Sequence, residues 1–149
     1  MFKLEVKVMN KLCGKFLISD LVKTLEFIGD QNNFLNCIAG VKIINDGKFL
    51  AEIKVFGVPL AVNGELLQYE ISPETLVLTI MIKTRALGGL SSIDIITKSK
   101  VSPNGDSVIW QSEYKISGLL SLFMKPLLES ITENIIIRTI ECIKSKISV

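Results

Sequence analysis

Residues 127–147 read LLESITENIIIRTIECIKSKI, and this stretch decides how the rest of the chain has to fold. Its apolar residues recur every three or four positions, which is the period of an amphipathic α-helix. They are Leu128, Ile131, Ile135, Ile136, Ile140, Ile143 and Ile147. Glutamates and lysines take the other side. A helix of about 20 residues spans roughly 30 Å, so we expect one long C-terminal helix whose apolar stripe must be covered by other elements.

The sequence before this helix predicts strands with one apolar face. Apolar and polar residues alternate through residues 49–55, 76–82 and 93–100, which is the period of a half-buried strand. Turn sequences separate these runs, Asn45-Asp46-Gly47 and Ser102-Pro103-Asn104-Gly105 among them. Repeated short turns favour an antiparallel meander with one covered side.

The N-terminal part predicts another strand and two short helices. Apolar residues hold the even positions through residues 2–18, with a bend expected near Asn10 or Gly14. Asp20 and Asp30 are suited to begin two helices that Gly29 and Gly40 would end. We therefore expect a single α+β domain over residues 1–149, in which a curved antiparallel sheet of about seven strands grips the long helix. The role of residues 1–9 stays open.

A strongly curved sheet and one straight helix cannot touch everywhere, so we expect a cavity between them. Nearly all inward positions are aliphatic or aromatic, with Thr97 and Ser99 as polar exceptions. Apolar pockets with few polar groups are typical of small-molecule sites. Trp110 and Tyr114 could line this pocket or simply belong to the core. The candidate ligand-binding residues are Leu78, Ile80, Ile95, Trp110, Tyr114, Leu120, Phe123, Met124, Leu127 and Ile131.

The chain offers little of the usual catalytic chemistry. It contains no histidine, which removes the commonest general base and most transition-metal sites. Most of its carboxylates fall at positions whose alternation points them outward, including Glu5, Glu52, Asp94 and Glu113. Cys13, Cys37 and Cys142 are odd in number and have no CxxC spacing. We therefore expect three free thiols, no catalytic residues, no metal and no cofactor.

Charge and hydropathy limit the partners. The net charge is +2 and only two arginines are present, so the clustered basic face of a nucleic-acid reader is missing. No uncharged stretch approaches the roughly 20 residues of a membrane span, and no signal-peptide pattern begins the chain. We expect a cytoplasmic protein. Residues 116–128, ISGLLSLFMKPLL, could pack on the sheet as the helix entry or form an apolar lip that touches a membrane or a partner.

Several local patterns resemble one protein family. They are Leu12-Cys13-Gly14-Lys15-Phe16, the segment NFLNCIAG over residues 33–40, the hairpin over residues 49–64, and Ala86-Leu87-Gly88-Gly89. Together they are similar to CoxG, a carbon monoxide dehydrogenase subunit family within the START-like helix-grip (SRPBCC) superfamily. Ala39 replaces the proline usual there, and Val58 separates a Gly-Pro pair. The resemblance covers roughly residues 11–148.

The resemblance implies a helix-grip protein that binds a lipid or quinone. It also implies an accessory role toward a molybdenum hydroxylase of the carbon monoxide dehydrogenase type, with transient contact at the inner face of the membrane. Two other hypotheses stay open. A cyclase- or dehydratase-like enzyme would use the same cavity with Arg85 or Tyr114 as its ionisable group. A pure interaction module would form a homodimer through Ile137, which lies off the main helical stripe.

Overall fold

The computed structural model describes residues 10–55, 57–86, 93–118 and 121–147, without the side chains of residues 55 and 121–124. Strands and helices follow one another as the sequence predicts, with two short helices after the first strand and one long helix at the end. The elements are β1 (Asn10–Leu17), α1 (Leu21–Ile28), α2 (Gln31–Leu35), β2 (Val41–Asn45), β3 (Lys48–Val55), β4 (Val58–Ile71), β5 (Leu78–Ala86), β6 (Asp94–Asn104), β7 (Ser107–Ser117) and α3 (Ser121–Ile147).

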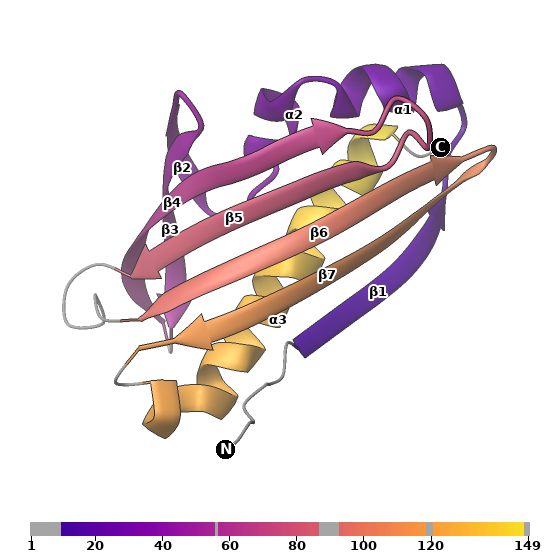
Figure 1. Ribbon diagram of the computed structural model, residues 1–149. Coiled ribbons are helices and arrows are strands. Elements are labelled where there is room, and N and C mark those ends of the chain that lie inside the picture. Colours follow the sequence, from indigo (N-terminus) through magenta and orange to yellow (C-terminus); the bar gives the residue numbers. More distant parts are fainter. Residues whose placement is uncertain (1–9, 56, 87–92, 119–120, 148–149) are drawn as a thin grey trace.

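The strands form one seven-stranded antiparallel sheet in the order β1-β7-β6-β5-β4-β3-β2 (Figure 1). Strands β2 to β7 are a meander, as predicted. The first strand then pairs with the last, from Asn10 opposite Tyr114 to Leu17 opposite Ser107. This register is continuous, so no bulge accompanies the bend that we expected near Gly14. Residues 2–9 of the predicted strand lie outside the described residues.

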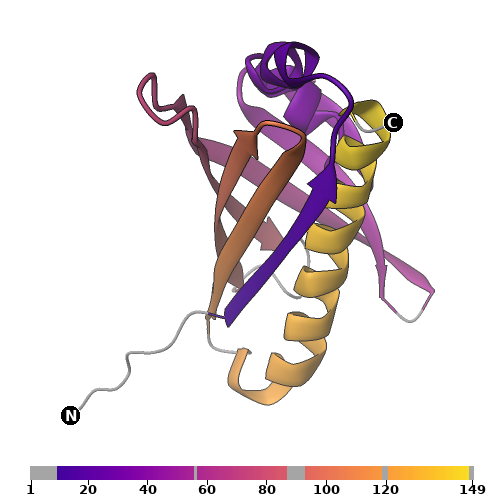
Figure 2. The same cartoon turned by 90° about the vertical axis from the view of Figure 1, so that its right-hand side faces the viewer.

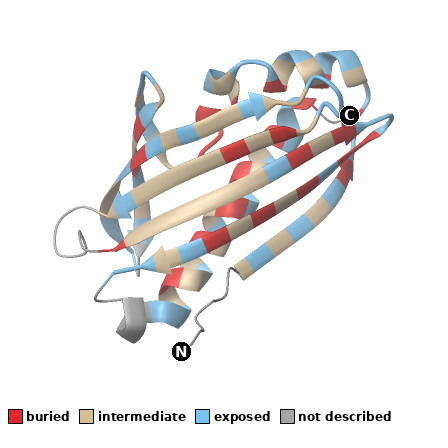
Figure 3. Ribbon diagram, in the orientation of Figure 1, coloured by how far each residue is buried: buried red, intermediate tan, exposed pale blue. Residues whose placement is uncertain are grey.

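Helix α3 lies across the inner face of the curved sheet, which confirms the helix-grip fold (Figures 1 and 2). Helices α1 and α2 lie at the end of the sheet where α3 finishes. Burial alternates along β1 and over most of β7, whereas β6 is half-buried for much of its length (Figure 3). Inward side chains of β5 and β7 share one hydrophobic core with residues of the apolar stripe of α3. Fully buried examples are Leu78, Ile80 and Tyr114. Ile137, off that stripe, is 42% exposed, but the homodimer suggested from it stays a prediction.

The two short helices begin as predicted. The Asp20 carboxylate accepts hydrogen bonds from the backbone N–H groups of Val22 and Lys23, and Asp30 accepts one from Asn32. Such side-chain caps satisfy amides that have no partner inside the helix. Helix α1 ends before Gly29, as expected. Helix α2 ends at Leu35 rather than near Gly40, because the following amides of Cys37 and Ile38 make tighter bonds to carbonyls three residues back.

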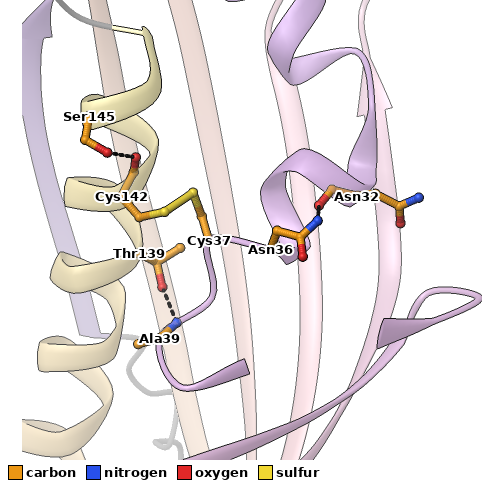
Figure 4. The surroundings of a disulfide bond; sticks show 7 residues. All are labelled: Asn32, Asn36, Cys37, Ala39, Thr139, Cys142 and Ser145. Atoms are coloured by element: carbon orange, nitrogen blue, oxygen red, sulfur yellow. Dashed lines mark hydrogen bonds between the residues drawn. A yellow bond between two sulfur atoms is a disulfide. The ribbon is translucent and has the colours of Figure 1, made fainter. Parts of the chain in front are cut away.

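The expectation of three free thiols is wrong for two of them. Cys37, just after α2, and Cys142 on α3 form a disulfide whose Cα atoms are 5.4 Å apart (Figure 4). Only Cys13 is free among the described residues, and it is exposed. The partners are 105 residues apart in sequence, and only the fold brings them together. Spacing alone gives no sign of such a pair.

Candidate ligand-binding cavity

An apolar cavity of about 150 Å³ lies between the sheet and α3. Inward-facing side chains of β3, β4, β5, β6 and β7 form its floor, with Phe49 and Ala51 at the β3 side and Trp110 at the β7 side. The side chains that form this floor alternate with outward ones because successive residues of a strand point to opposite faces. Residues that strand alternation predicts to face inward therefore line this cavity.

The opposite wall comes from α3 and from the segment that contains α2. Helix α3 contributes Leu127, Leu128 and Ile131 at one end and Ile140 at the other. Phe34 and Ile38 close the end next to the disulfide. In that region the Ala39 amide donates a hydrogen bond of 3.4 Å to the hydroxyl of Thr139 (Figure 4). The segment over residues 33–40 and α3 are thus held together by a covalent bond and a hydrogen bond.

The structure brings half of the predicted ligand-binding residues to the cavity. Those that line it are Ile80, Ile95, Trp110, Leu127 and Ile131. Leu78 and Tyr114 are fully buried but lie outside the lining. Leu120 and the side chains of Phe123 and Met124 fall outside the described residues.

Tyr114 faces inward but contacts the helix instead of the cavity. Its hydroxyl donates a hydrogen bond to the carboxylate of Glu133 on α3. One turn earlier, Glu129 accepts a hydrogen bond of 2.6 Å from the side-chain amide of Asn10 on β1. Burial, followed by the contact with Glu133, raises the pKa of Tyr114 above its ordinary value. The phenol therefore serves to hold α3 against β7.

Hydroxyl groups are the polar part of the lining. Thr97 and Ser99 were predicted to face inward, and both line the cavity. Ser112 was missed, although it lies on the same face of β7 as Trp110 and Tyr114 and could have been found by parity. Its Oγ lies 2.7 Å from Oγ of Ser99. Thr84 on β5 and two helix residues, Thr132 and Thr139, also line the cavity and were not predicted.

None of the described residues that line the cavity has an ionisable side chain. Arg85, which the enzyme hypothesis would place inside, points outward and is 53% exposed. Its guanidinium forms two hydrogen bonds with Asp94, at 2.6 Å and 3.0 Å. The hydrogen bond from Arg85 lowers the pKa of Asp94. Arg85 is therefore not a residue of this cavity, because its strand position faces the opposite side of the sheet.

Metal ligands and membrane spans are also missing from the part of the chain that the structure describes. It contains no group of three histidine, cysteine, aspartate or glutamate side chains that could hold a metal ion. None of its helices combines the length and the hydropathy needed to cross a bilayer.

Comparisons with known proteins agree with this architecture. The family model of CoxG, described as a carbon monoxide dehydrogenase subunit, matches residues 14–148. No curated protein sequence matches the chain significantly.

Solved structures share the fold at low sequence identity. A conserved protein from Geobacillus kaustophilus aligns with a TM-score of 0.64 and 13% identity, covering 93% of this chain and 94% of that one. A hypothetical protein from Helicobacter pylori gives 0.59 and 14%, covering 93% and 85%. Norcoclaurine synthase from Thalictrum flavum, solved with dopamine and hydroxybenzaldehyde, gives 0.56 and 14%, covering 93% and 86%. At these identities the likeness shows the fold alone.

Proposed function

This chain belongs to CoxG, a family of carbon monoxide dehydrogenase subunits, and we propose that it binds a hydrophobic small molecule, a lipid or a quinone, without catalysing a reaction on it. The observation that carries this proposal is the cavity between sheet and α3, whose described lining is apolar apart from hydroxyl groups. Concave apolar sites with a few polar groups are the usual form of small-molecule sites. In this proposal Ile80, Ile95 and Trp110 contact the ligand from the sheet, and Leu127 and Ile131 contact it from the helix.

The size of the cavity limits how much of the ligand it can enclose. Its volume of about 150 Å³ is close to that of an engineered apolar cavity of about 150 Å³ that binds benzene. Pockets for larger ligands usually reach ~300–1,000 Å³. We therefore propose that the cavity holds one ring or a short length of chain, and that a longer ligand either extends beyond it or requires α3 to move away from the sheet.

We further propose that the protein is an accessory factor of a molybdenum hydroxylase of the carbon monoxide dehydrogenase type. Family membership supports this role. The protein would carry its ligand between the hydroxylase and the inner face of the membrane, where contact would be transient. A carrier needs a site that encloses an apolar molecule away from water, and burial of apolar surface supplies the free energy for that.

The binding proposal is tested by identifying what the protein carries. Native mass spectrometry of the purified protein, followed by solvent extraction, should recover a lipid or an isoprenoid quinone. Trp110 is the only tryptophan of the chain and lines the cavity, so its fluorescence should change when such a ligand is added. Repeated recovery of empty protein, together with no fluorescence change on adding quinones or fatty acids, would contradict the proposal.

The accessory role is tested with the hydroxylase itself. A carbon monoxide dehydrogenase is mixed with quinone-containing vesicles, and quinone reduction is followed with and without this protein. The protein should raise the rate, and a variant with a filled cavity, Ala51→Leu, should not. Equal rates with and without the protein would reject the accessory role and leave the binding proposal intact.

A further inference from the structure

Three hydroxyl groups lie next to one another on the sheet side of the cavity. Ser99 on β6 and Ser112 on β7 are partners in the strand register, and their Oγ atoms are 2.7 Å apart. Thr97 lies two residues before Ser99 and therefore on the same face of β6. All three line the cavity, between Trp110 on one side and aliphatic residues of β5 on the other. Three of the four hydroxyl groups that the described sheet residues place in the lining are thus neighbours, and the fourth belongs to Thr84.

These hydroxyls have protons to donate into the cavity. Ser99 and Ser112 carry two protons between them, and their mutual hydrogen bond uses one. No described residue accepts the other, nor a proton from Thr97. Elsewhere in the lining, Thr84 and Thr132 already donate to the carbonyl oxygens of Ile95 and Leu128, and on the helix side the Thr139 hydroxyl accepts from the amide of Ala39. Ser112 is only 1% exposed, and a buried donor without an acceptor costs free energy that a bound acceptor would recover.

The same surroundings are unsuitable for a charged ligand. No lysine or arginine is among the described lining residues, and Arg85 is paired with Asp94 on the opposite face. A carboxylate placed in this cavity would lose its hydration and gain no cation in return. Burial of an unpaired charge is far more costly than burial of a hydrogen-bonded neutral group.

We propose that the cavity selects an uncharged ligand with a carbonyl oxygen, which accepts hydrogen bonds from Thr97 and from the Ser99–Ser112 pair. This inference rests on the proposed function, because it names the chemical class of ligand for the same cavity. A cavity of this kind would bind ketones, quinones and esters in preference to free fatty acids and pure hydrocarbons. The apolar walls supply affinity for the body of the ligand. The hydroxyls of Thr97, Ser99 and Ser112 orient the polar end of the ligand toward β6 and β7.

Three small probes of similar size test the inference: acetophenone, ethylbenzene and benzoate. Their dissociation constants are measured by calorimetry for the wild type, for Thr97→Val and for the double variant Ser99→Ala/Ser112→Ala. Loss of one hydrogen bond should weaken acetophenone about 3- to 10-fold. Ethylbenzene should bind as before or more tightly, since the variants are more apolar. Benzoate should show no binding to the wild type at neutral pH.

A matched control separates hydrogen bonding from general damage. Thr79→Val makes the same chemical change as Thr97→Val, but on β5 and on the outer face of the sheet. It should leave all dissociation constants unchanged. An unchanged ratio of the acetophenone and ethylbenzene constants in Thr97→Val and in the serine variant would overturn the inference. So would benzoate binding as tight as that of acetophenone. Failure of all three probes to bind the wild type would instead contradict the proposed function.

Discussion

At the residue scale, Gly40 and Gly64 allow two close approaches that a side chain would prevent. Gly40 ends that segment with a φ of +77°, and a Cβ atom there would overlap the carbonyl oxygen of Glu52. Gly64 leaves room for the ring of Phe49, which an added Cβ would also overlap. The glycine that ends the segment NFLNCIAG therefore has a physical reason. Only glycine fits both the left-handed backbone and the contact with β3.

Gly40→Ala should destabilise the protein much more than Gly105→Ala. Gly105 has a φ of +65° but nothing within 4 Å of an added Cβ, so it isolates the cost of the backbone conformation. That cost is about 1–2 kcal/mol. Gly40→Ala adds a backbone clash, and we expect a total loss of about 3 kcal/mol or more in the free energy of unfolding. Urea denaturation of both variants measures the difference. Equal losses would show that the backbone at Glu52 can move away from the added Cβ without lowering the free energy of unfolding.

The two tyrosines of the chain should resist ionisation in the folded protein. Burial raises the pKa of Tyr69, which donates a 2.6 Å hydrogen bond to the carbonyl oxygen of Ile28, and burial also raises that of Tyr114. The phenols therefore have a higher pKa in the folded protein than in the unfolded chain, where it is about 10. Their contribution to stability is complete below about pH 10 and is lost as the pH rises further.

Absorbance at 295 nm checks this during an alkaline titration. The folded protein should show no tyrosinate signal near pH 10 and a steep rise only when it unfolds at higher pH. The chain in denaturant should titrate near its ordinary value of about 10. Tyr69→Phe and Tyr114→Phe should each remove half of the final signal. A tyrosinate step near pH 10 in the folded wild type would show that the pKa of at least one of the two phenols is not raised by folding.

At the scale of elements, strand parity predicted the sheet and the inward faces, and the 3.6-residue period predicted α3. Parity could not separate Tyr114, which bonds to Glu133, from Trp110, which lines the cavity, because both point inward from β7. The distinction depends on where α3 crosses the sheet. The disulfide was not predicted for the same reason, since only the fold brings Cys37, in the segment after α2, next to Cys142 on α3.

Cys142→Ser should lower the stability of the oxidised protein strongly. The disulfide joins residues 105 positions apart. For a closed loop of about 100 residues the chain-entropy description gives a stabilisation of roughly 4.7 kcal/mol, and removal of a native disulfide typically costs about 2–5 kcal/mol. We expect a loss of about 3 kcal/mol in the free energy of unfolding. Reduction of the wild type with a dithiol should produce a similar loss and should change nothing further in Cys142→Ser.

Cys13→Ser is the matched control for this substitution. Cys13 is exposed and free, so its replacement should leave the unfolding free energy and its response to the dithiol unchanged. A wild type whose unfolding is insensitive to reduction would mean that the two thiols are not joined in solution.

At the scale of the whole molecule, the predicted grip of sheet and helix is confirmed, whereas the volume left between them could not be predicted. Parity names the side chains that face inward but does not say where they meet those of α3. Small residues such as Ala51 and Ala86 are among those that line the space of about 150 Å³, and longer side chains at these positions would take up part of it. An unfilled cavity lowers stability, because its walls lose contacts that a filled core would make. The protein is therefore less stable than it would be with this cavity filled.

Filling the cavity should therefore separate stability from function. Ala51 on β3 is 4% exposed and lines the cavity, whereas Ala61 on β4 is paired with Glu52 and faces away from it. Ala51→Leu should remove ligand binding and raise the midpoint of thermal unfolding by a few degrees, since cavity-filling changes commonly add about 0.5–2 kcal/mol. Ala61→Leu makes the same change on the opposite face and should leave binding intact. Unchanged binding of acetophenone in Ala51→Leu would place the ligand elsewhere. A gain in stability together with a loss of binding would mean that the small side chain at position 51 is kept for the ligand rather than for the fold.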